Sequence, residues 1–299
     1  MSRPYHISVL VAEVLQYLDP QPHKIYVDAT FGGGGHTRAI LSKEPTCRVI
    51  AIDWDRHAID THEEQFKAEF GDRLTIIWGN FAQLSLLLKK QNITKVDGIL
   101  ADFGTSQHHI FAGRGFSFLD DSPLDMRMSP AHHQITAAHI LNRASEQELV
   151  HIFKEYSQEP HARLIARTII AQRDKTPFKT TGQLAKLIEQ IVPRHGSHIH
   201  PATRVFQALR IAVNHELEAI RGFLHQVPLV LNNNGRLVCI SFHALEDGLV
   251  KNFLREHRAH TNNLGFVSLT DGPVQAGEQE RDDNPSARSA KLRAAIFQL

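Results

Sequence analysis

The sequence predicts an α/β fold with a mostly parallel, doubly wound, Rossmann-like sheet that is interrupted by an inserted all-helical domain. Short apolar segments alternate with segments of helical periodicity as far as residue 102. This alternation stops between residues 107 and 211 and returns near residue 235. Strands that alternate with helices at this spacing indicate a parallel sheet covered by helices on both faces.

The first part of the chain supplies four strands and four helices. The expected strands are short apolar runs bounded by polar or turn-forming residues, at 24–29, 48–53, 74–78 and 96–102. The expected helices are at 8–18, 36–42, 56–70 and 82–91. Ser8 precedes the first of them and is a candidate N-cap.

The middle of the chain shows helical periodicity alone. Helices are expected at 134–142, 145–156, 160–173 and 180–192. Pro201 suits the first turn of a further, long helix that is expected to run to about Leu224. We therefore expect residues 1–106 and 212–299 to form one discontinuous domain, with 107–211 as the helical insertion.

The last part of the chain returns to the α/β pattern. Strands are expected at 235–241 and 291–297, with a helix at 245–257. Residues 261–288 are polar and contain several Gly and Pro residues, which predicts a mobile loop.

Composition excludes several classes of protein. The 299 residues carry a formal net charge of +1, so a nucleic-acid site would have to come from local clustering of basic residues. The two cysteines form no CxxC pair and the histidines are scattered, so no metal site is expected. No apolar run approaches the roughly 20 residues of a membrane span, and the N-terminus lacks the order of a secretory signal. A cytoplasmic protein is expected.

A glycine-rich loop follows the first expected strand. It reads Asp28-Ala29-Thr30-Phe31 and then four glycines before His36. Glycines at this point of a doubly wound sheet let the backbone approach a bound ligand closely. A tight turn without a ligand, braced by Asp28, is the alternative.

Two more carboxylates end strands at the same expected edge. Asp53 ends the second strand and can accept hydrogen bonds from ribose hydroxyls, or can simply cap the next helix. Asp102 ends the fourth strand. S-adenosylmethionine and NAD both carry such a ribose. The loop departs from GxGxxG and offers only Arg38 to a phosphate, so the acidic edge favours a cationic sulfonium over a pyrophosphate.

Long motifs occur in a fixed order almost from end to end of the chain. The N-terminal ones are His6-x-x-Val9-Leu10 with Glu13, the glycine loop, Ala51-Ile52-Asp53-x-Asp55 and Asp97-Gly98-Ile99-Leu100-x-Asp102-x-Gly104. The later ones are Arg114-Gly115-Phe116-Ser117-Phe118, Pro123-Leu124-Asp125-Met126-Arg127-Met128, His200-Pro201-Ala202-Thr203-Arg204-x-Phe206-Gln207-Ala208-Leu209-Arg210-Ile211, Ile240-Ser241-Phe242-His243 with Leu245-Glu246-Asp247, and Asn284-Pro285 before Arg288-Ser289. On these motifs the chain resembles the RsmH (MraW) family of bacterial 16S rRNA cytosine-N4 methyltransferases.

The resemblance implies a class I S-adenosylmethionine-dependent methyltransferase fold with a helical insertion. It also implies methyl transfer to the exocyclic amine of a decoding-centre cytidine in 16S rRNA of the small ribosomal subunit. The family's cofactor contacts correspond here to Gly34, Gly35, His36, Asp53, Phe81 and Asp102. A further family contact is a glutamine, at whose position this sequence has His109, or Gln107 if the loop shifts. A second departure is Ala244, where the family usually has Ser.

Four residues are candidates for the chemistry. We hypothesise that Asp102 binds the cofactor or orients the amine, with Ser106 shaping the pocket, because the Asn/Asp-Pro-Pro-aromatic motif of many amino-methyltransferases is absent. Asp125 is the other candidate acceptor. His243 is a candidate for stacking on the target base, with a packing role as the alternative.

Six residues of the insertion are candidates for contacting RNA. Phe116 and Phe118 could stack on an extruded base, or could be buried in the core of the insertion. Four arginines could meet phosphates: Arg114, Arg127, Arg204 and Arg210. Ion pairing with Asp120, Asp121, Asp125 or Glu216 is the alternative for them.

Other functions stay open at this point. One is an enzyme of the same fold that acts on DNA or on a protein amine. Another is a non-catalytic assembly factor of the small subunit, and a third is an NAD-dependent oxidoreductase. The expected partner is 16S rRNA or the small subunit, with no membrane, and the oligomeric state is left open between a monomer and a homodimer.

Overall fold

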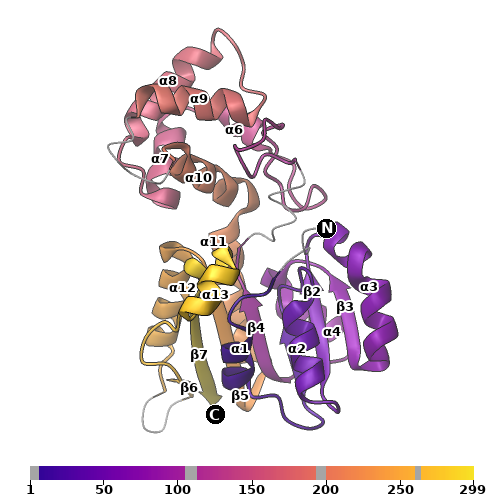
Figure 1. Ribbon diagram of the computed structural model, residues 1–299. Helices are drawn as coiled ribbons and strands as arrows, with labels where there is room; N and C mark the ends of the chain where they lie inside the picture. The colour runs from indigo at the N-terminus through magenta and orange to yellow at the C-terminus, as the bar shows by residue number, and fades with distance from the viewer. Residues whose placement is uncertain (1–6, 105–112, 193–199, 260–263) are drawn as a thin grey trace. The chain divides into compact units, whose positions relative to one another are not determined.

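The computed structural model describes residues 7–104, 113–192, 200–259 and 264–299. The chain divides into two compact units (Figure 1). The first unit combines Met1–Gly104 with Leu217–Leu299, and the second is Thr105–Glu216. The second unit overlaps the insertion expected at 107–211. It extends to Glu216, next to His215, where one helix ends and the next begins.

The first unit is built on a sheet of seven strands in the order β3-β2-β1-β4-β5-β7-β6, counted over the described residues. The strands are β1 Ile25–Asp28, β2 Arg48–Asp53, β3 Leu74–Trp78, β4 Val96–Asp102, β5 Leu231–Ser241, β6 Gly265–Ser268 and β7 Lys291–Gln298. Strands β1 to β5 pair in parallel, whereas β7 is antiparallel to both β5 and β6. The mostly parallel, Rossmann-like sheet is therefore confirmed.

Helices cover this sheet and alternate with its strands (Figure 1). They are α1 Val11–Leu18, α2 Gly35–Lys43, α3 Arg56–Phe70, α4 Leu84–Lys90, α11 Glu216–Val230, α12 Ala244–Glu256 and α13 Glu278–Asp283. Three short 3-10 turns complete the unit, at Gly71–Arg73, Phe81–Gln83 and Pro285–Arg288. One buried apolar cluster joins α1, α2 and α3 to the strands, with Leu18, Ile40, Phe66 and Val49 among its members.

The parallel arrangement determines where three carboxylates lie. Asp28, Asp53 and Asp102 are the last residues of β1, β2 and β4, which are neighbours in the sheet. Because the carboxyl ends of parallel strands meet at one edge, the three side chains gather there. The bounds of β2, β3, β4 and α3 agree residue for residue with those expected from the sequence.

The second unit consists of helices and long connections. Its helices are α6 Ala137–Arg143, α7 Glu146–Ser157, α8 Ala162–Arg173, α9 Thr181–Ile191 and α10 Ala202–Asn214. Ser145 and Thr180 start α7 and α9 with capping boxes, which satisfy amides at the helix start. Among its described residues no strand forms, and one isolated bridge joins Pro123 to Thr180.

Three expectations from the sequence are wrong. Ser8 does not cap the first helix, because α1 begins at Val11 with Leu10 as its N-cap residue and without a side-chain cap. The long helix expected from Pro201 to about Leu224 is divided at His215, whose φ of 50° and ψ of 40° are left-handed and end α10. The mobile loop expected at 261–288 instead contains β6, α13 and a 3-10 turn among its described residues. No helix formed by the described residues is both long enough and apolar enough to cross a membrane.

Asn214, the last residue of α10, holds the segment Met126–Met128. Its buried side chain accepts a hydrogen bond from the Met128 amide at 2.7 Å and donates to the Met126 carbonyl at 2.7 Å. Met126 has a left-handed φ of 60°. The amide of Asn214 therefore fixes a strained turn that carries Asp125 and Arg127.

We expect Asn214→Ala to lower the free energy of unfolding by about 2–4 kcal/mol, because it leaves a buried amide and a buried carbonyl without partners. Thr203→Ala on the exposed side of the same helix is the control, with an expected change below about 0.5 kcal/mol. Urea unfolding of both variants checks this. Equal stability of the two variants would contradict the role given to Asn214.

Candidate cofactor site and substrate-contacting residues

The glycine loop between β1 and α2 leaves no room for larger side chains. Gly34 has a left-handed φ of 74°, and a Cβ atom there would collide with the rings of Phe66 and Phe31. A Cβ atom on Gly35 would collide with the Ser8 hydroxyl. At Gly34 both conformation and space favour glycine, and at Gly35 space does, so the backbone of the loop packs closely against its neighbours at the sheet edge.

Asp28 braces this loop from below. Its fully buried carboxylate accepts hydrogen bonds from the Thr30 amide at 3.1 Å and the Thr37 hydroxyl at 2.7 Å. Burial raises the pKa of this carboxyl above its usual range, while nearby His36 and the two hydrogen bonds act in the opposite direction. Of the two interpretations that the sequence left open for Asp28, the brace is the one that the contacts support.

Asp53 ties the loop to the next strand. Its two carboxylate oxygens accept hydrogen bonds from the Gly32 amide at 2.7 Å and the Asp55 amide at 2.8 Å. Asp55, and not Asp53, is the N-cap of α3, where it accepts from the His57 amide. A carboxylate oxygen can accept more than one hydrogen bond, so these two contacts are compatible with Asp53 also accepting from ribose hydroxyls.

Phe81 contributes an apolar side to the same edge of the sheet. Its ring, which is almost entirely buried, lies 5.6 Å from that of Trp54, 6.0 Å from that of Phe103 and 5.7 Å from that of Phe223, measured between centroids. The 3-10 turn that starts at Phe81 is capped by the Asn80 side chain. An aromatic cluster beside a carboxylate that can bind ribose suits a nucleoside.

Asp102 is the carboxylate at this edge with an unused hydrogen-bonding atom. Its amide donates to the Thr30 hydroxyl at 2.7 Å, and its side chain is only 11% exposed. Oδ2 lies 3.7 Å from Nδ1 of His36, whereas Oδ1 is buried without a hydrogen-bond partner among the described residues. Burial raises the pKa of Asp102 to about 7; His36 opposes this, and the carboxylates of Asp28 and Glu246 add to it.

His36 is fixed between two elements. The ring is buried, and Nε2 lies 2.9 Å from the Val9 carbonyl oxygen. A carbonyl only accepts hydrogen bonds, so Nε2 carries the proton, and Nδ1 is the nitrogen directed toward Asp102. His36 therefore belongs to the wall of the site and lies beside the carboxyl group of Asp102.

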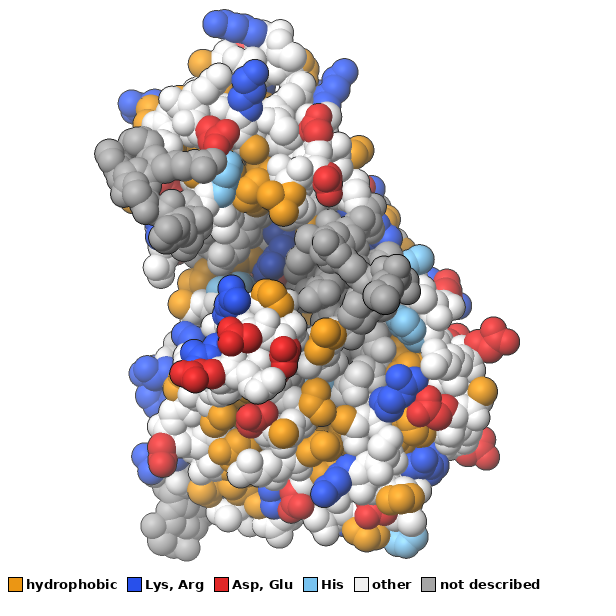
Figure 2. Space-filling view, in the orientation of Figure 1, with side chains coloured by type: hydrophobic (Ala, Val, Ile, Leu, Met, Phe, Trp, Pro, Cys, Tyr) orange, Lys and Arg blue, Asp and Glu red, His pale blue; other side chains and the backbone are white. Residues whose placement is uncertain are grey.

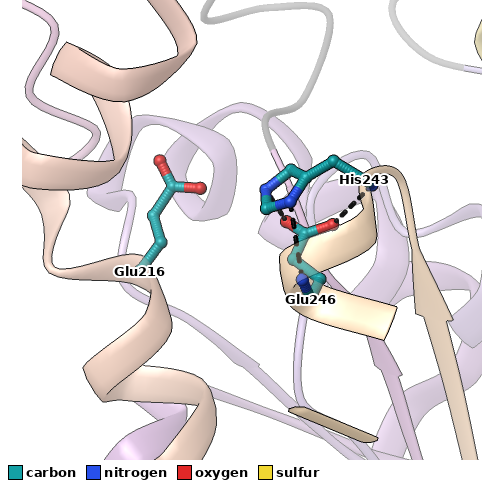
Figure 3. Close-up of side chains that lie close together, drawn as sticks. All are labelled: Glu216, His243 and Glu246. Carbon is teal, nitrogen blue, oxygen red and sulfur yellow. Dashed lines mark hydrogen bonds and ion pairs between the residues drawn. The ribbon is translucent and has the colours of Figure 1, made fainter. Parts of the chain in front are cut away.

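His243 and Glu246 start α12, directly after β5 (Figure 3). Glu246 is fully buried and accepts from the amides of Phe242 at 2.7 Å and His243 at 3.2 Å. The Glu246 amide in turn donates to His243 Nδ1 at 3.4 Å, and His243 Nε2 lies 3.1 Å from Glu246 Oε1. His243 thus has the structural role that was the alternative to base stacking, and stacking stays a prediction.

Glu246 and Thr30 were missed as site residues by the sequence analysis. Glu246 lies in one of the ordered motifs, and its position three residues after His243 is the spacing of a capping box, which is the signal that could have identified it. The Thr30 hydroxyl accepts a hydrogen bond from the Asp102 amide. The two residues are 72 positions apart, so no local sequence pattern indicates this contact.

In the second unit, two of the candidate arginines are engaged in ion pairs. Arg127 Nε and Nη2 donate to the two oxygens of Asp125 at 2.6 and 2.8 Å. Arg210 makes a similar two-point pair with Glu216, at 2.9 Å for each contact. Asp125 is thus a carboxylate held by Arg127, which lowers its pKa against the effect of burial.

Arg114 and Arg204 differ from these two. The Arg114 guanidinium donates to the Met128 carbonyl at 3.4 Å, and Arg204 is exposed on α10. Figure 2 shows Lys and Arg side chains interspersed with Asp and Glu on the face drawn, without one continuous basic patch. Phosphate contacts by Arg114 and Arg204 stay predictions.

The aromatic candidates of the insertion are partly buried. The Phe118 ring packs against His200 at 4.5 Å and Phe206 at 5.0 Å between centroids, which agrees with the alternative of burial in the helical core. Phe116 is half-buried. Three predicted site residues lie outside the described residues: Ser106, Gln107 and His109.

Together these features define the chemistry that the first unit can support. The glycine loop, the Asp53 carboxylate, an aromatic cluster and an Asp102 oxygen that has no hydrogen-bond partner among the described residues lie at the carboxyl edge of a parallel sheet. The carboxylates suit a ligand that joins a nucleoside to a positive charge, as the sulfonium of S-adenosylmethionine does. This fold and site are those of a class I S-adenosylmethionine-dependent methyltransferase.

The chain belongs to the MraW methylase family, which matches residues 3–298. A relative from Bradyrhizobium diazoefficiens is 47% identical over 308 residues, covering 99% of this chain and 92% of its own. A relative from Desulfotalea psychrophila is 44% identical and covers 97% of both chains. One from Thermotoga neapolitana is 44% identical, covering 97% of this chain and 95% of its own. All three are named ribosomal RNA small subunit methyltransferase H.

We expect Gly34→Ala to weaken binding of S-adenosylmethionine at least about tenfold, because the new methyl group would push Phe66 and Phe31 out of place. Gly71→Ala is the control for a positive φ: Gly71 has a φ of 56°, with a ψ of −135° where Gly34 has 10°, and nothing lies within 4 Å of its Cβ position. Isothermal titration calorimetry compares the two. A similar loss of affinity in both variants would show that backbone strain, and not the collision, is responsible.

The raised pKa of Asp102 predicts how stability depends on pH. Its folded pKa of about 7 lies above the ordinary value of 3.8, so its contribution to stability is complete below about pH 4 and is lost as pH rises through about 7. We expect this group to lower the Tm of the free protein progressively between about pH 4 and 7, and Asp102→Asn to reduce this fall. The exposed Asp72→Asn variant, as control, should keep the wild-type pH profile. An unchanged profile in Asp102→Asn would contradict the assignment.

Proposed function

We propose that this protein transfers the methyl group of S-adenosylmethionine to the exocyclic N4 amine of a decoding-centre cytidine in 16S rRNA of the small ribosomal subunit. The observation that carries the proposal is the buried Oδ1 of Asp102 beside the glycine loop, which has no hydrogen-bond partner among the described residues. The names of the relatives support small-subunit rRNA as substrate. The family resemblance in the motifs supports the cytosine amine.

The cofactor would be held by the residues at the sheet edge. Asp53 would accept the ribose hydroxyls, Phe81 would flank the base, and the glycine loop would let the backbone approach closely. When bound, S-adenosylmethionine supplies an electrophilic methyl group. The chain's contribution is then mainly positioning, because a methyl transfer needs the amine in line with the sulfonium carbon.

Asp102 would act on the amine. The lone pair of an exocyclic cytosine amine is delocalised into the ring, so a hydrogen-bond acceptor beside the amine helps to localise it. With a pKa of about 7, Asp102 can be a carboxylate at neutral pH and can take up the proton that the amine loses on methylation. Asp125 is a weaker candidate, since Arg127 already occupies both of its oxygens.

The helical unit would recognise RNA. A base has to leave its stack, or lie in a single strand, to enter such a site. Arg114 and Arg204 are the arginines for which no side-chain ion pair is described, so they are the better candidates for phosphate contacts. Arg127 and Arg210 would instead maintain the local structure of this unit.

The test is methylation of purified small subunits with labelled S-adenosylmethionine, followed by mapping of the modified nucleotide. We expect one N4-methylated cytidine in the decoding centre. In single-turnover reactions with saturating cofactor, Asp102→Asn should lower the rate by about 100-fold or more, the usual size of a general acid–base contribution. Asp125→Asn is the comparison and should have the smaller effect.

Three results would contradict the proposal. Full single-turnover rates in both variants would remove Asp102 and Asp125 as proton acceptors. Label in another nucleotide, or in a protein, would show that the acceptor is different. Cofactor binding without turnover on any ribosomal substrate would favour an assembly factor.

A further inference from the structure

Helix α13 and the 3-10 turn after it hold the N-terminal segment Ile7–Leu10. Glu280 Oε1 accepts a hydrogen bond from the Leu10 amide at 2.6 Å, and Asn284 Nδ2 donates to the Ile7 carbonyl at 2.9 Å. Asn284 is buried and also caps the 3-10 turn by accepting from the Ser286 amide at 3.2 Å. The two side chains therefore hold the start of the segment and its end.

The held segment is in a conformation that needs support. Leu10 is the N-cap residue of α1, has a left-handed φ of 53°, and offers no side-chain cap. Left-handed backbone at a bulky residue is costly, and a buried amide needs a partner. Glu280 supplies that partner from a position 270 residues away.

The same segment forms one wall of the cofactor site. The Val9 carbonyl accepts the Nε2 proton of His36 at 2.9 Å, and the Ser8 side chain fills the space next to Gly35. His36 Nδ1 in turn faces Asp102 at 3.7 Å. An unbroken series of contacts thus leads from Glu280 and Asn284 through Ile7–Leu10 to His36 and Asp102.

We propose that Glu280 and Asn284 are positioning residues of the cofactor site: they keep the Val9 carbonyl against His36 and so fix the His36 ring beside Asp102. Their effect on cofactor affinity rests on the function proposed above. Their effect on His36 does not, because every contact in the series is made by the protein alone.

Three variants and one control separate this role from a general loss of stability. Glu280→Ala removes the acceptor for Leu10, whereas Glu280→Gln keeps an oxygen there. Asn284→Asp keeps the oxygen that caps Ser286 but loses the donor to Ile7. Glu278→Ala changes an exposed glutamate on the same helix and is the matched control.

The first measurement is the tautomer of His36 in the protein without cofactor, from NMR of ¹⁵N-labelled histidine rings, with the His36 signals assigned by their loss in His36→Asn. Wild type, Glu280→Gln and Glu278→Ala should show one Nε2–H form. Glu280→Ala and Asn284→Asp should show exchange between ring states. Circular dichroism confirms that each variant is folded.

The second measurement is calorimetric titration with S-adenosylhomocysteine. Loss of one hydrogen bond in the series should weaken binding about three- to tenfold in Glu280→Ala and Asn284→Asp, with affinity largely restored in Glu280→Gln. Unchanged His36 signals and unchanged affinity in both variants would overturn the inference. If wild type bound no S-adenosylhomocysteine while His36 still responded to Glu280→Ala, the proposed function would fail and the positioning role would stand.

Discussion

The structure depends on placing carboxylates at the buried end of a parallel sheet. Burial of a carboxylate is costly unless hydrogen bonds compensate for lost water. Asp28 and Asp53 are compensated by loop amides and the Thr37 hydroxyl, and this compensation shapes the glycine loop. The burial of Asp102 is compensated only in part, because its Oδ1 has no hydrogen-bond partner among the described residues. The charge of this carboxyl group can therefore respond to a ligand that binds beside it. The burial of carboxylates at the sheet edge thus shapes the glycine loop and also favours a positively charged ligand.

Much of the α/β unit was predictable from sequence because its signals are local. Buried parallel strands are short apolar runs, and the bounds of β2, β3 and β4 follow from them directly. The acidic strand ends and the glycine loop are equally local. The break at His215 was not predictable, because apolar periodicity continues across it and a single left-handed residue leaves no mark on that pattern.

The remaining differences arise from contacts between distant residues. Residues 261–288 have the composition of a loop, yet α13 is ordered through Glu280 and Asn284, whose partners lie at the other end of the chain. The arginines show the same limit. Sequence could not decide whether Arg127 and Arg210 contact phosphates or carboxylates. Each arginine has a carboxylate within six positions along the chain, and that spacing alone does not show whether the two side chains meet.

The position of β7 has a consequence for biosynthesis. This strand lies between β5 and β6, and α13, just before it in the chain, secures the segment beside His36. A nascent chain lacking residues 278–298 therefore lacks the strand that joins β6 to the sheet and the two side chains that hold Ile7–Leu10. Contacts of such long sequence separation require most of the chain to be present before they can form. If Glu280 and Asn284 have the positioning role proposed above, full affinity for the nucleoside is expected only once this last stretch of the chain has been synthesised.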